Sequence, residues 1–189
     1  MLNNLSGLIL KKIGWSLTSG IPEGTKKCVL VVAPHTSNWD FVIGRLCFNV
    51  IGLPTKFLMK KELFIWPLGI LLRKLGGIPV NRNRNNNVIK EVAHLFTQYD
   101  ELIVTLTPEG TRKLTKNWKK GFYYIAELAK VPVAVAFIDY KKKECGIAFL
   151  FTPTGDYEKD FEPIRALYYD KKARFPENFN LSPMYQDKK

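Results

Sequence analysis

The chain has 189 residues, of which 46% are hydrophobic and 24% charged, which is typical of one globular domain with a sizeable core. These figures exclude a disordered, collagen-like or disulfide-stapled protein. Lys and Arg number 29 against 17 Asp and Glu, a formal charge of +12 that attracts nucleic acid, an anionic membrane or a phosphorylated substrate.

Residues 1–20 are predicted to form an amphipathic helix ahead of the main domain. Apolar residues recur at helical spacing at Leu2, Leu5, Ile9 and Ile13. The segment lacks the basic start of a signal peptide, and the chain has no run of about 18 apolar residues that would predict a transmembrane helix. The helix can cover the core or lie in a membrane interface, and the pattern favours neither.

Residues 21–169 alternate between strand and helix patterns. Short runs rich in β-branched residues predict strands at 27–33, 55–59, 78–80, 101–106, 131–138 and 146–151. Helices are predicted at 40–51, 88–99, 117–130 and 157–168, an interrupted apolar stretch at 62–75 and a polar loop at 81–87. The alternation predicts a single-domain α/β fold with a mostly parallel central sheet flanked by helices. Residues 170–189 are charged and predict a loosely ordered tail.

The chain offers few residues for metal or covalent chemistry. Cys28, Cys47 and Cys145 form no C-x-x-C pair, so we expect neither a disulfide framework nor a metal site. Cys28 and Cys47 lie in apolar stretches and are expected to pack as small hydrophobic residues. The sequence contains no G-x-S-x-G elbow, Walker A loop or G-x-G-x-x-G motif, which disfavours covalent serine catalysis and nucleotide chemistry.

His35 lies just after a predicted strand, in a position that is typical of functional residues in α/β proteins. His35 follows the predicted strand 27–33, and Asp40 stands at or near the start of the next helix. Functional groups gather at the carboxyl ends of strands in α/β sheets, and one tight turn can bring the carboxylate to an imidazole nitrogen. The carboxylate would then fix the tautomer and leave the other nitrogen as a general base. The alternative is that Asp40 only caps the helix and His35 is incidental; His94 falls in a helical pattern and is interpreted as structural.

Two further elements place cations at strand ends. Residues 107–112 follow a predicted strand, and in them Gly110 permits a tight turn, Thr111 supplies a hydroxyl and Arg112 can grip a phosphate through paired hydrogen bonds. Arg82 follows a short extended piece after a Gly-Gly pair. Each element can be a surface turn with a solvated Arg. With the His–Asp pair, however, they would make a site for an anionic substrate whose hydroxyl is deprotonated.

Taken in chain order, these elements resemble the motifs of the glycerolipid acyltransferase family, of the lysophosphatidic acid (1-acylglycerol-3-phosphate) type. The family's His-x4-Asp (HX4D) motif matches His35 and Asp40, and its Pro-Glu-Gly-Thr-Arg motif matches Pro108–Arg112 without change. Its glycine motif that ends in Arg is similar to Gly77–Arg82 with one residue fewer, or to Gly76–Arg82 at full spacing, and its Val-Pro-Val strand is similar to Val131–Val133.

The resemblance covers about residues 28–138 and implies a glycerol-3-phosphate acyltransferase-like fold, with the catalytic domain at 21–169. It implies transfer of a fatty acyl group from an acyl thioester to the hydroxyl of a lysophospholipid such as lysophosphatidic acid, in phospholipid biosynthesis. Acyl-CoA or acyl carrier protein would be the co-substrate, with no cofactor. Other lysolipid or amino-lipid acceptors stay open. A basic nucleic-acid- or membrane-binding module is the alternative from another class, although no recognised nucleic-acid motif supports it.

The family's motifs also imply roles for the matching residues. His35 would take the hydroxyl proton as general base and Asp40 would orient it, so that the hydroxyl attacks the thioester directly. Asn38 or a backbone N–H of this turn would steady the oxyanion. The acceptor's polar head would be held by Arg82, Glu109, Gly110, Thr111 and Arg112.

Charge and resemblance together predict an enzyme bound peripherally to the cytoplasmic face of an anionic membrane. The apolar stretch around Trp66 lies beside Arg73 and Lys74, and it can dip into the bilayer or pack in the core. We expect partners in the lysolipid, the acyl donor and the membrane surface, and none in nucleic acid.

Overall fold

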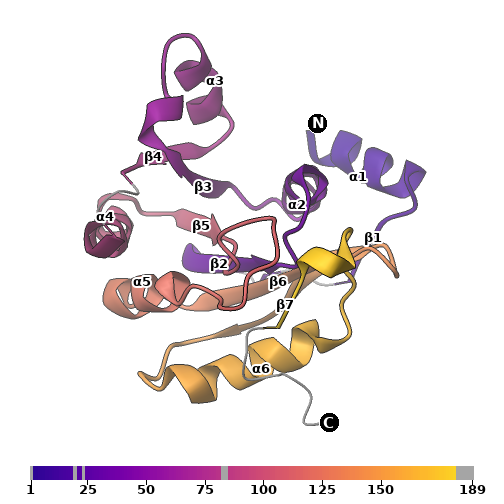
Figure 1. The fold of residues 1–189 in the computed structure, drawn as a ribbon. Coiled ribbons are helices and arrows are strands. Elements are labelled where there is room, and N and C mark those ends of the chain that lie inside the picture. Colours follow the sequence, from indigo (N-terminus) through magenta and orange to yellow (C-terminus); the bar gives the residue numbers. More distant parts are fainter. Residues whose placement is uncertain (1, 19–20, 23, 82–84, 182–189) are drawn as a thin grey trace.

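Seven strands form one sheet in the order β1-β7-β6-β2-β5-β3-β4 (Figure 1). The structure, a computed structural model, describes residues 2–18, 21–22, 24–81 and 85–181. The strands span β1 Ser16–Leu17, β2 Lys27–Ala33, β3 Thr55–Lys60, β4 Gly77–Val80, β5 Leu102–Leu106, β6 Val133–Asp139 and β7 Glu144–Phe151. Every neighbouring pair is parallel except β6 and β7, which form a hairpin, so the predicted mostly parallel sheet is confirmed.

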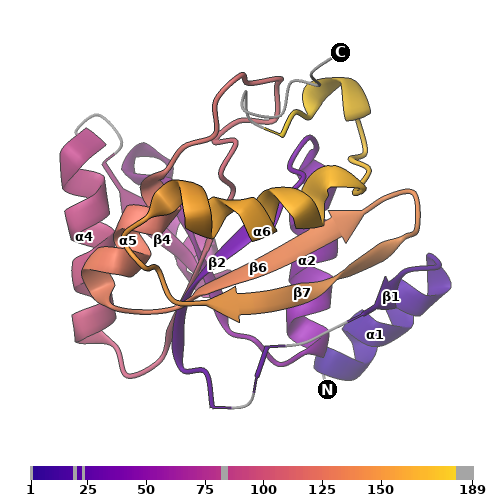
Figure 2. The same cartoon turned by 90° about the horizontal axis from the view of Figure 1, so that it is seen from below.

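Helices cover both faces of the sheet. They span α1 Leu2–Lys12, α2 Asn38–Val50, α3 Leu68–Lys74, α4 Asn85–Gln98, α5 Gly121–Ala129 and α6 Tyr157–Tyr169, with short 3-10 turns η1 Lys61–Leu63 and η2 Pro176–Asn178. Because side chains alternate along a strand, Val29 and Val31 of β2 join one core with α4, α5 and α6, while Cys28 and Leu30 join another with α1 and α2. Figure 2 shows α6 lying across β6 and β7. No helix in the described ranges combines the length and hydropathy needed to cross a bilayer.

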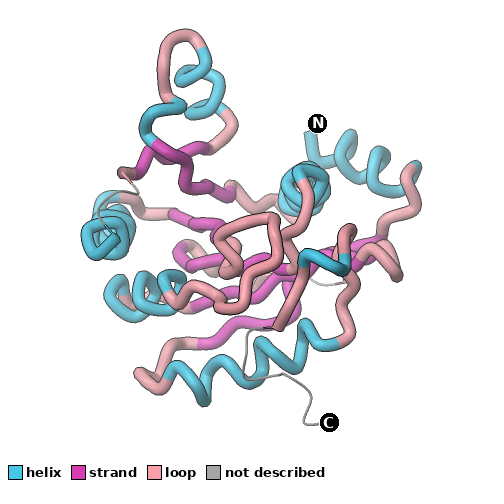
Figure 3. Tube along the Cα trace, in the orientation of Figure 1, coloured by secondary structure: helices cyan, strands magenta, loops and turns pink. Residues whose placement is uncertain are grey.

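The centre of the sheet positions the turn that carries His35 and Asp40. β2 is buried from Cys28 to Ala33, because these residues are all apolar, and it pairs in parallel with β5 on one side and β6 on the other. The carboxyl ends of β2, β5 and β6 therefore lie side by side, where α/β proteins place their sites. Figure 3 shows the long loop that follows β5 at this edge of the sheet. The chain after α6 also reaches the carboxyl end of β2, where the Phe175 N–H donates to Thr36 Oγ1 at 3.2 Å.

Tertiary contacts shift several element boundaries from their predicted places. β1 has two residues, too few to give a pattern, and pairs with β7. α4 begins at Asn85, inside the run predicted as a loop, because Asn costs a helix little more than most residues do. α5 begins at Gly121 and not at Asn117, because the preceding Trp118 turns into the core, where its indole N–H donates to Asn180 O at 2.7 Å.

The chain after α6 packs on the domain as far as the structure describes it. Phe179 and Leu181 pack against the core cluster, and Ala173 is buried. The predicted loose tail is therefore wrong for residues 170–181, because apolar side chains in it find a place in the core. Residues 182–189 lie outside the described part of the chain.

The three cysteines are all buried and free. Cys28 and Cys47 belong to the core beside α1 and α2, which confirms that they pack as small hydrophobic residues. Burial raises the pKa of the Cys28 thiol to about 12, so that this thiol is not a nucleophile at neutral pH.

Candidate active site

The turn between β2 and α2 carries the predicted His–Asp pair. Ser37 caps α2, and its side chain accepts a hydrogen bond from Trp39 N at 3.1 Å. Asp40 closes this capping box from the third helical position, where Oδ2 accepts hydrogen bonds from the amides of Ser37 at 2.7 Å and Thr36 at 2.6 Å. The helix start therefore folds the carboxylate back over the turn that holds His35. Asp40 does help to cap the helix, and it reaches His35 as well.

His35 and Asp40 lie within ion-pair distance of each other. Nδ1 of His35 is 3.4 Å from Oδ2 of Asp40, and their side chains are 21% and 2% exposed, respectively. The buried carboxylate faces Nδ1, which favours the tautomer with the proton on Nδ1 and leaves the lone pair on Nε2. A general base requires this arrangement, with one nitrogen fixed and the other ready to take a proton.

The Asp40 carboxylate is held in its charged form. Burial by itself raises the pKa of Asp40, but hydrogen bonds from His35, the Tyr140 hydroxyl and the amides of Ser37 and Thr36 outweigh burial and bring the pKa below its ordinary value of 3.8. The Tyr140 hydroxyl donates to Oδ1 at 2.7 Å. Asp40 is therefore a carboxylate at neutral pH, and it can stabilise an imidazolium formed at His35 during proton transfer.

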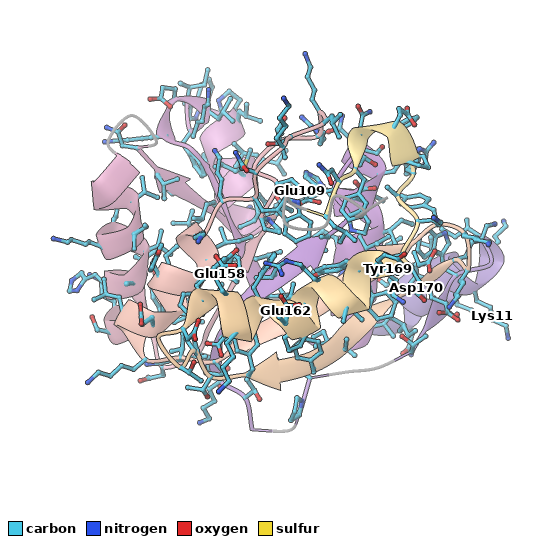
Figure 4. All side chains as sticks on the ribbon, turned by 60° about the horizontal axis from the view of Figure 1, so that its bottom comes forward. Lys11, Glu109, Glu158, Glu162, Tyr169 and Asp170 are labelled. Atoms are coloured by element: carbon cyan, nitrogen blue, oxygen red, sulfur yellow. The ribbon has the colours of Figure 1, made fainter. Side chains whose placement is uncertain are left out.

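Glu109, in the turn after β5, lies behind His35. It is 4% exposed, and its Oε1 accepts a hydrogen bond from the His35 N–H at 2.8 Å, whereas Oε2 is buried and finds no hydrogen-bond partner among the described residues. Burial raises the pKa of Glu109 to about 7, although hydrogen bonds from backbone amides oppose the rise. In the view of Figure 4, Glu109 is labelled above α6, which carries Glu158 and Glu162. The Glu109 carboxyl thus contacts the turn of His35, and a contact between Glu109 and an acceptor head group stays a prediction.

The other predicted head-group residues lie on the loop after β5. Gly110 has φ +65°, a left-handed backbone conformation that favours glycine in this tight turn. Thr111 and Arg112 are exposed beside it, and Thr111 Oγ1 accepts a hydrogen bond from Lys113 N at 3.2 Å. The predicted residue Arg82 lies outside the described residues. The structure therefore brings His35, Asp40 and Glu109 together and leaves Thr111 and Arg112 at the surface of the same loop.

Comparisons with known proteins identify the family. The model of the Acyltransferase family matches residues 18–138, which is more than half of the chain. The chain belongs to this family. The comparison with curated proteins gives no match. Among solved structures, the crystal structure of the 1-acyl-sn-glycerophosphate (LPA) acyltransferase PlsC from Thermotoga maritima is similar, with a TM-score of 0.61 and 19% identity over 88% of this chain and 74% of that one.

The comparisons confirm two of the predictions. The protein is an acyltransferase enzyme, as the motifs implied. Its α/β fold is similar to that of PlsC, and at 19% identity this likeness concerns the fold alone. His35, Asp40 and Glu109 all lie within the matched part of the acyltransferase.

Sequence reasoning missed one residue that contacts the His35–Asp40 pair, Tyr140. Its hydroxyl contacts Asp40, yet it lies beyond residue 138, where the family match ends. A signal was present, because Tyr140 directly follows β6 and the carboxyl end of β6 adjoins that of β2. Like His35, Tyr140 therefore lies at the carboxyl end of a central strand, as the order of the strands shows.

Proposed function

We propose that this acyltransferase moves a fatty acyl group from an acyl thioester to the hydroxyl of a lysophospholipid, with lysophosphatidic acid as the preferred acceptor. The observation that carries the proposal is the 3.4 Å approach of His35 Nδ1 to the buried Asp40 carboxylate, at the carboxyl end of the central strand. PlsC, whose fold is similar, is an LPA acyltransferase. The product would serve phospholipid biosynthesis.

The reaction needs one base and no covalent intermediate on the protein. His35 Nε2 takes the proton of the acceptor hydroxyl while the oxygen attacks the thioester carbonyl. The tetrahedral intermediate then expels the thiolate, which recovers the proton from His35 and leaves as the free thiol. Asp40 holds the ring and stabilises the imidazolium in between. The thioester donor is acyl-CoA or an acyl carrier protein, and no cofactor is required.

The oxyanion of this intermediate needs donors that the protein has not already used. The amides of His35, Thr36 and Ser37 all donate to carboxylates, the first to Glu109 and the other two to Asp40. They are therefore engaged in holding the turn. Asn38 is exposed next to them, and its side chain is our candidate for this role.

The phosphate of the acceptor is assigned to the loop after β5. Arg112 is exposed there, and a guanidinium can bind a phosphate through two parallel hydrogen bonds. Thr111 and Gly110 shape the same turn, and Arg82 is a second cation at the end of β4 in the sequence. Glu109 would contribute through His35 and would not need to touch the phosphate.

We also propose that the enzyme binds peripherally to the cytoplasmic face of an anionic membrane through the segment between β3 and β4. Figure 1 shows this segment, with α3, projecting from one edge of the sheet. Trp66 is 83% exposed and Ile65 is 65% exposed, which no core role explains. Further exposed apolar and basic side chains in the segment are Leu63, Leu68, Ile70, Leu71, Lys61, Arg73 and Lys74. Apolar side chains can enter the interface while the cations meet anionic lipid, at ~1 kcal/mol for each.

The α1 helix offers a second contact with the same membrane. Its Leu10 is buried in the core beside α2, but Leu5 is 56% exposed and Leu8 66% exposed. One face of the helix therefore covers the core and the other is left for the interface, so that both roles considered for it are compatible.

An acyl-transfer assay with a panel of lysolipids tests the proposal. The full chain is supplied with radiolabelled acyl-CoA or acyl carrier protein and with lysophosphatidic acid, uncharged lysolipids and an amino-lipid. We expect the diacyl product of lysophosphatidic acid to form fastest. Absence of product with every lysolipid and both donors would rule the proposed reaction out, and faster acylation of an amino-lipid would reassign the acceptor.

A further inference from the structure

The Asp40 carboxylate is shared between donors from two different parts of the chain. Oδ2 faces His35 and accepts the amides of Thr36 and Ser37, all within the same turn. Oδ1 accepts the hydroxyl of Tyr140, which lies 100 residues away, at 2.7 Å. The terminal torsion of an Asp side chain is soft, so a carboxylate held by one oxygen can swing. The bond to Oδ1 removes this freedom and ties the turn to the end of β6.

Tyr140 is itself held by several contacts. Its ring meets Trp15 edge-on with the ring centroids 5.1 Å apart, and its N–H donates to Lys172 O at 2.9 Å. The Arg174 guanidinium lies 5.9 Å from the Tyr140 ring centroid and 5.5 Å from that of Trp39, at the start of α2. Burial and the nearby carboxylate raise the pKa of the Tyr140 hydroxyl above its ordinary value of 10, so the hydroxyl stays protonated and can donate.

The chain that follows α6 also contacts the catalytic turn directly. The N–H of Phe175 donates to Oγ1 of Thr36 at 3.2 Å, and Thr36 is buried. Residues 172–175 thus hold both Tyr140 and the turn. Tyr140 and residues 172–175 lie beyond the family match, which ends at residue 138.

We infer that Tyr140 is a positioning residue for acyl transfer, because it keeps the Asp40 carboxylate turned toward His35. Residues 172–175 hold Tyr140 and the turn of His35 in place. The inference rests on the proposed roles of His35 and Asp40. Tyr140 needs no contact with either substrate for this. Its loss should therefore lower kcat and leave KM for the donor and the acceptor unchanged.

The test is Tyr140→Phe, which removes the hydroxyl and keeps the ring. The matched control is Tyr123→Phe, because the Tyr123 hydroxyl donates to Asp160 Oδ2 at the same 2.7 Å, between α5 and α6. We expect kcat to fall roughly tenfold in Tyr140→Phe with both KM values within about twofold, because a hydrogen bond to a charged group is lost. Tyr123→Phe should keep the kcat of the wild type. A kcat within about twofold of wild type in Tyr140→Phe, or an equal loss in the control, would overturn the inference.

A second readout needs no enzymatic activity. Hydrogen–deuterium exchange at the amides of Thr36 and Ser37, which donate to Asp40, should be faster in Tyr140→Phe and unchanged in Tyr123→Phe. Unchanged exchange in Tyr140→Phe would contradict the positioning role. If the wild type transferred no acyl group, the proposed function would fail while the exchange measurement still tested whether Tyr140 holds the turn.

Discussion

The N–H of His35 donates a 2.8 Å hydrogen bond to Oε1 of Glu109, 74 residues further along the chain. This bond joins two motifs that the sequence shows as separate, because β2 and β5 are neighbours and their carboxyl ends adjoin. Two charged residues of the Pro-Glu-Gly-Thr-Arg motif lie in different surroundings, one buried and one exposed. Buried Glu109 supports the turn that holds His35, and Arg112 is exposed toward solvent.

Buried Glu109 should make the stability of the protein depend on pH. Its pKa is about 7 in the folded protein against 4.5 ordinarily, so the folded state binds more protons than the unfolded state between these two values. The free energy of unfolding should therefore fall as the pH rises through this window, by roughly 3 kcal/mol in total. Urea denaturation of the wild type from pH 4.5 to 7.5 measures the fall.

Two variants decide whether Glu109 is the cause of that fall. In Glu109→Gln most of the decline should disappear, because an amide does not titrate. Glu101→Gln, at an exposed position just before β5, should keep the decline of the wild type. Equal slopes in all three proteins would assign the effect to another group. Asp40 does not interfere, since its pKa lies below 3.8, outside this window.

Asp40→Asn should remove both the charge and part of the cap of α2. We expect kcat to fall about 10²- to 10⁴-fold, because the amide cannot stabilise the imidazolium, while KM for the acceptor changes little. Steady-state kinetics at pH 7.5 measures both constants. A kcat within about threefold of the wild type would show that Asp40 serves the helix start alone.

Much of this site can be predicted from local sequence, and some of it cannot. The strand 27–33 has the predicted bounds because its apolar run ends abruptly at Pro34, and the His35–Asp40 pair follows from spacing within one turn. The direction of the Glu109 carboxyl depends on which strands become neighbours, which no local pattern contains. The same holds for Trp118, which is buried with its indole N–H donating to the distant Asn180 carbonyl, so that the predicted helix 117–130 begins only at Gly121.

Arg112→Ala should weaken the binding of a phosphorylated acceptor. Loss of a guanidinium that pairs with phosphate is expected to raise KM for lysophosphatidic acid about tenfold or more, with little change in KM for the acyl donor. Lys113→Ala removes the neighbouring exposed cation and is the control for charge alone. Equal increases of KM in both variants would indicate that the loop attracts anions generally and that Arg112 makes no specific contact.

Trp66→Ser should weaken membrane binding without affecting the core, since Trp66 is 83% exposed. Sedimentation with vesicles that contain phosphatidylglycerol should show severalfold less bound protein than for the wild type, and high salt should weaken the binding of both. Leu128→Ser is the control, because Leu128 is 55% exposed on α5, away from the segment between β3 and β4. Unchanged binding of Trp66→Ser would place the membrane contact elsewhere, for instance on α1.

The rate of acyl transfer in His35→Ala is the most direct test of His35 as the general base. The chain has two histidines, and His94, exposed on α4, provides the matched variant His94→Ala. With lysophosphatidic acid and acyl-CoA or acyl carrier protein, His35→Ala should lose at least about 10²-fold in kcat while its thermal unfolding midpoint stays close to that of the wild type. His94→Ala should keep the wild-type rate. A His35→Ala rate within about threefold of the wild type would contradict the assignment of His35 as the general base.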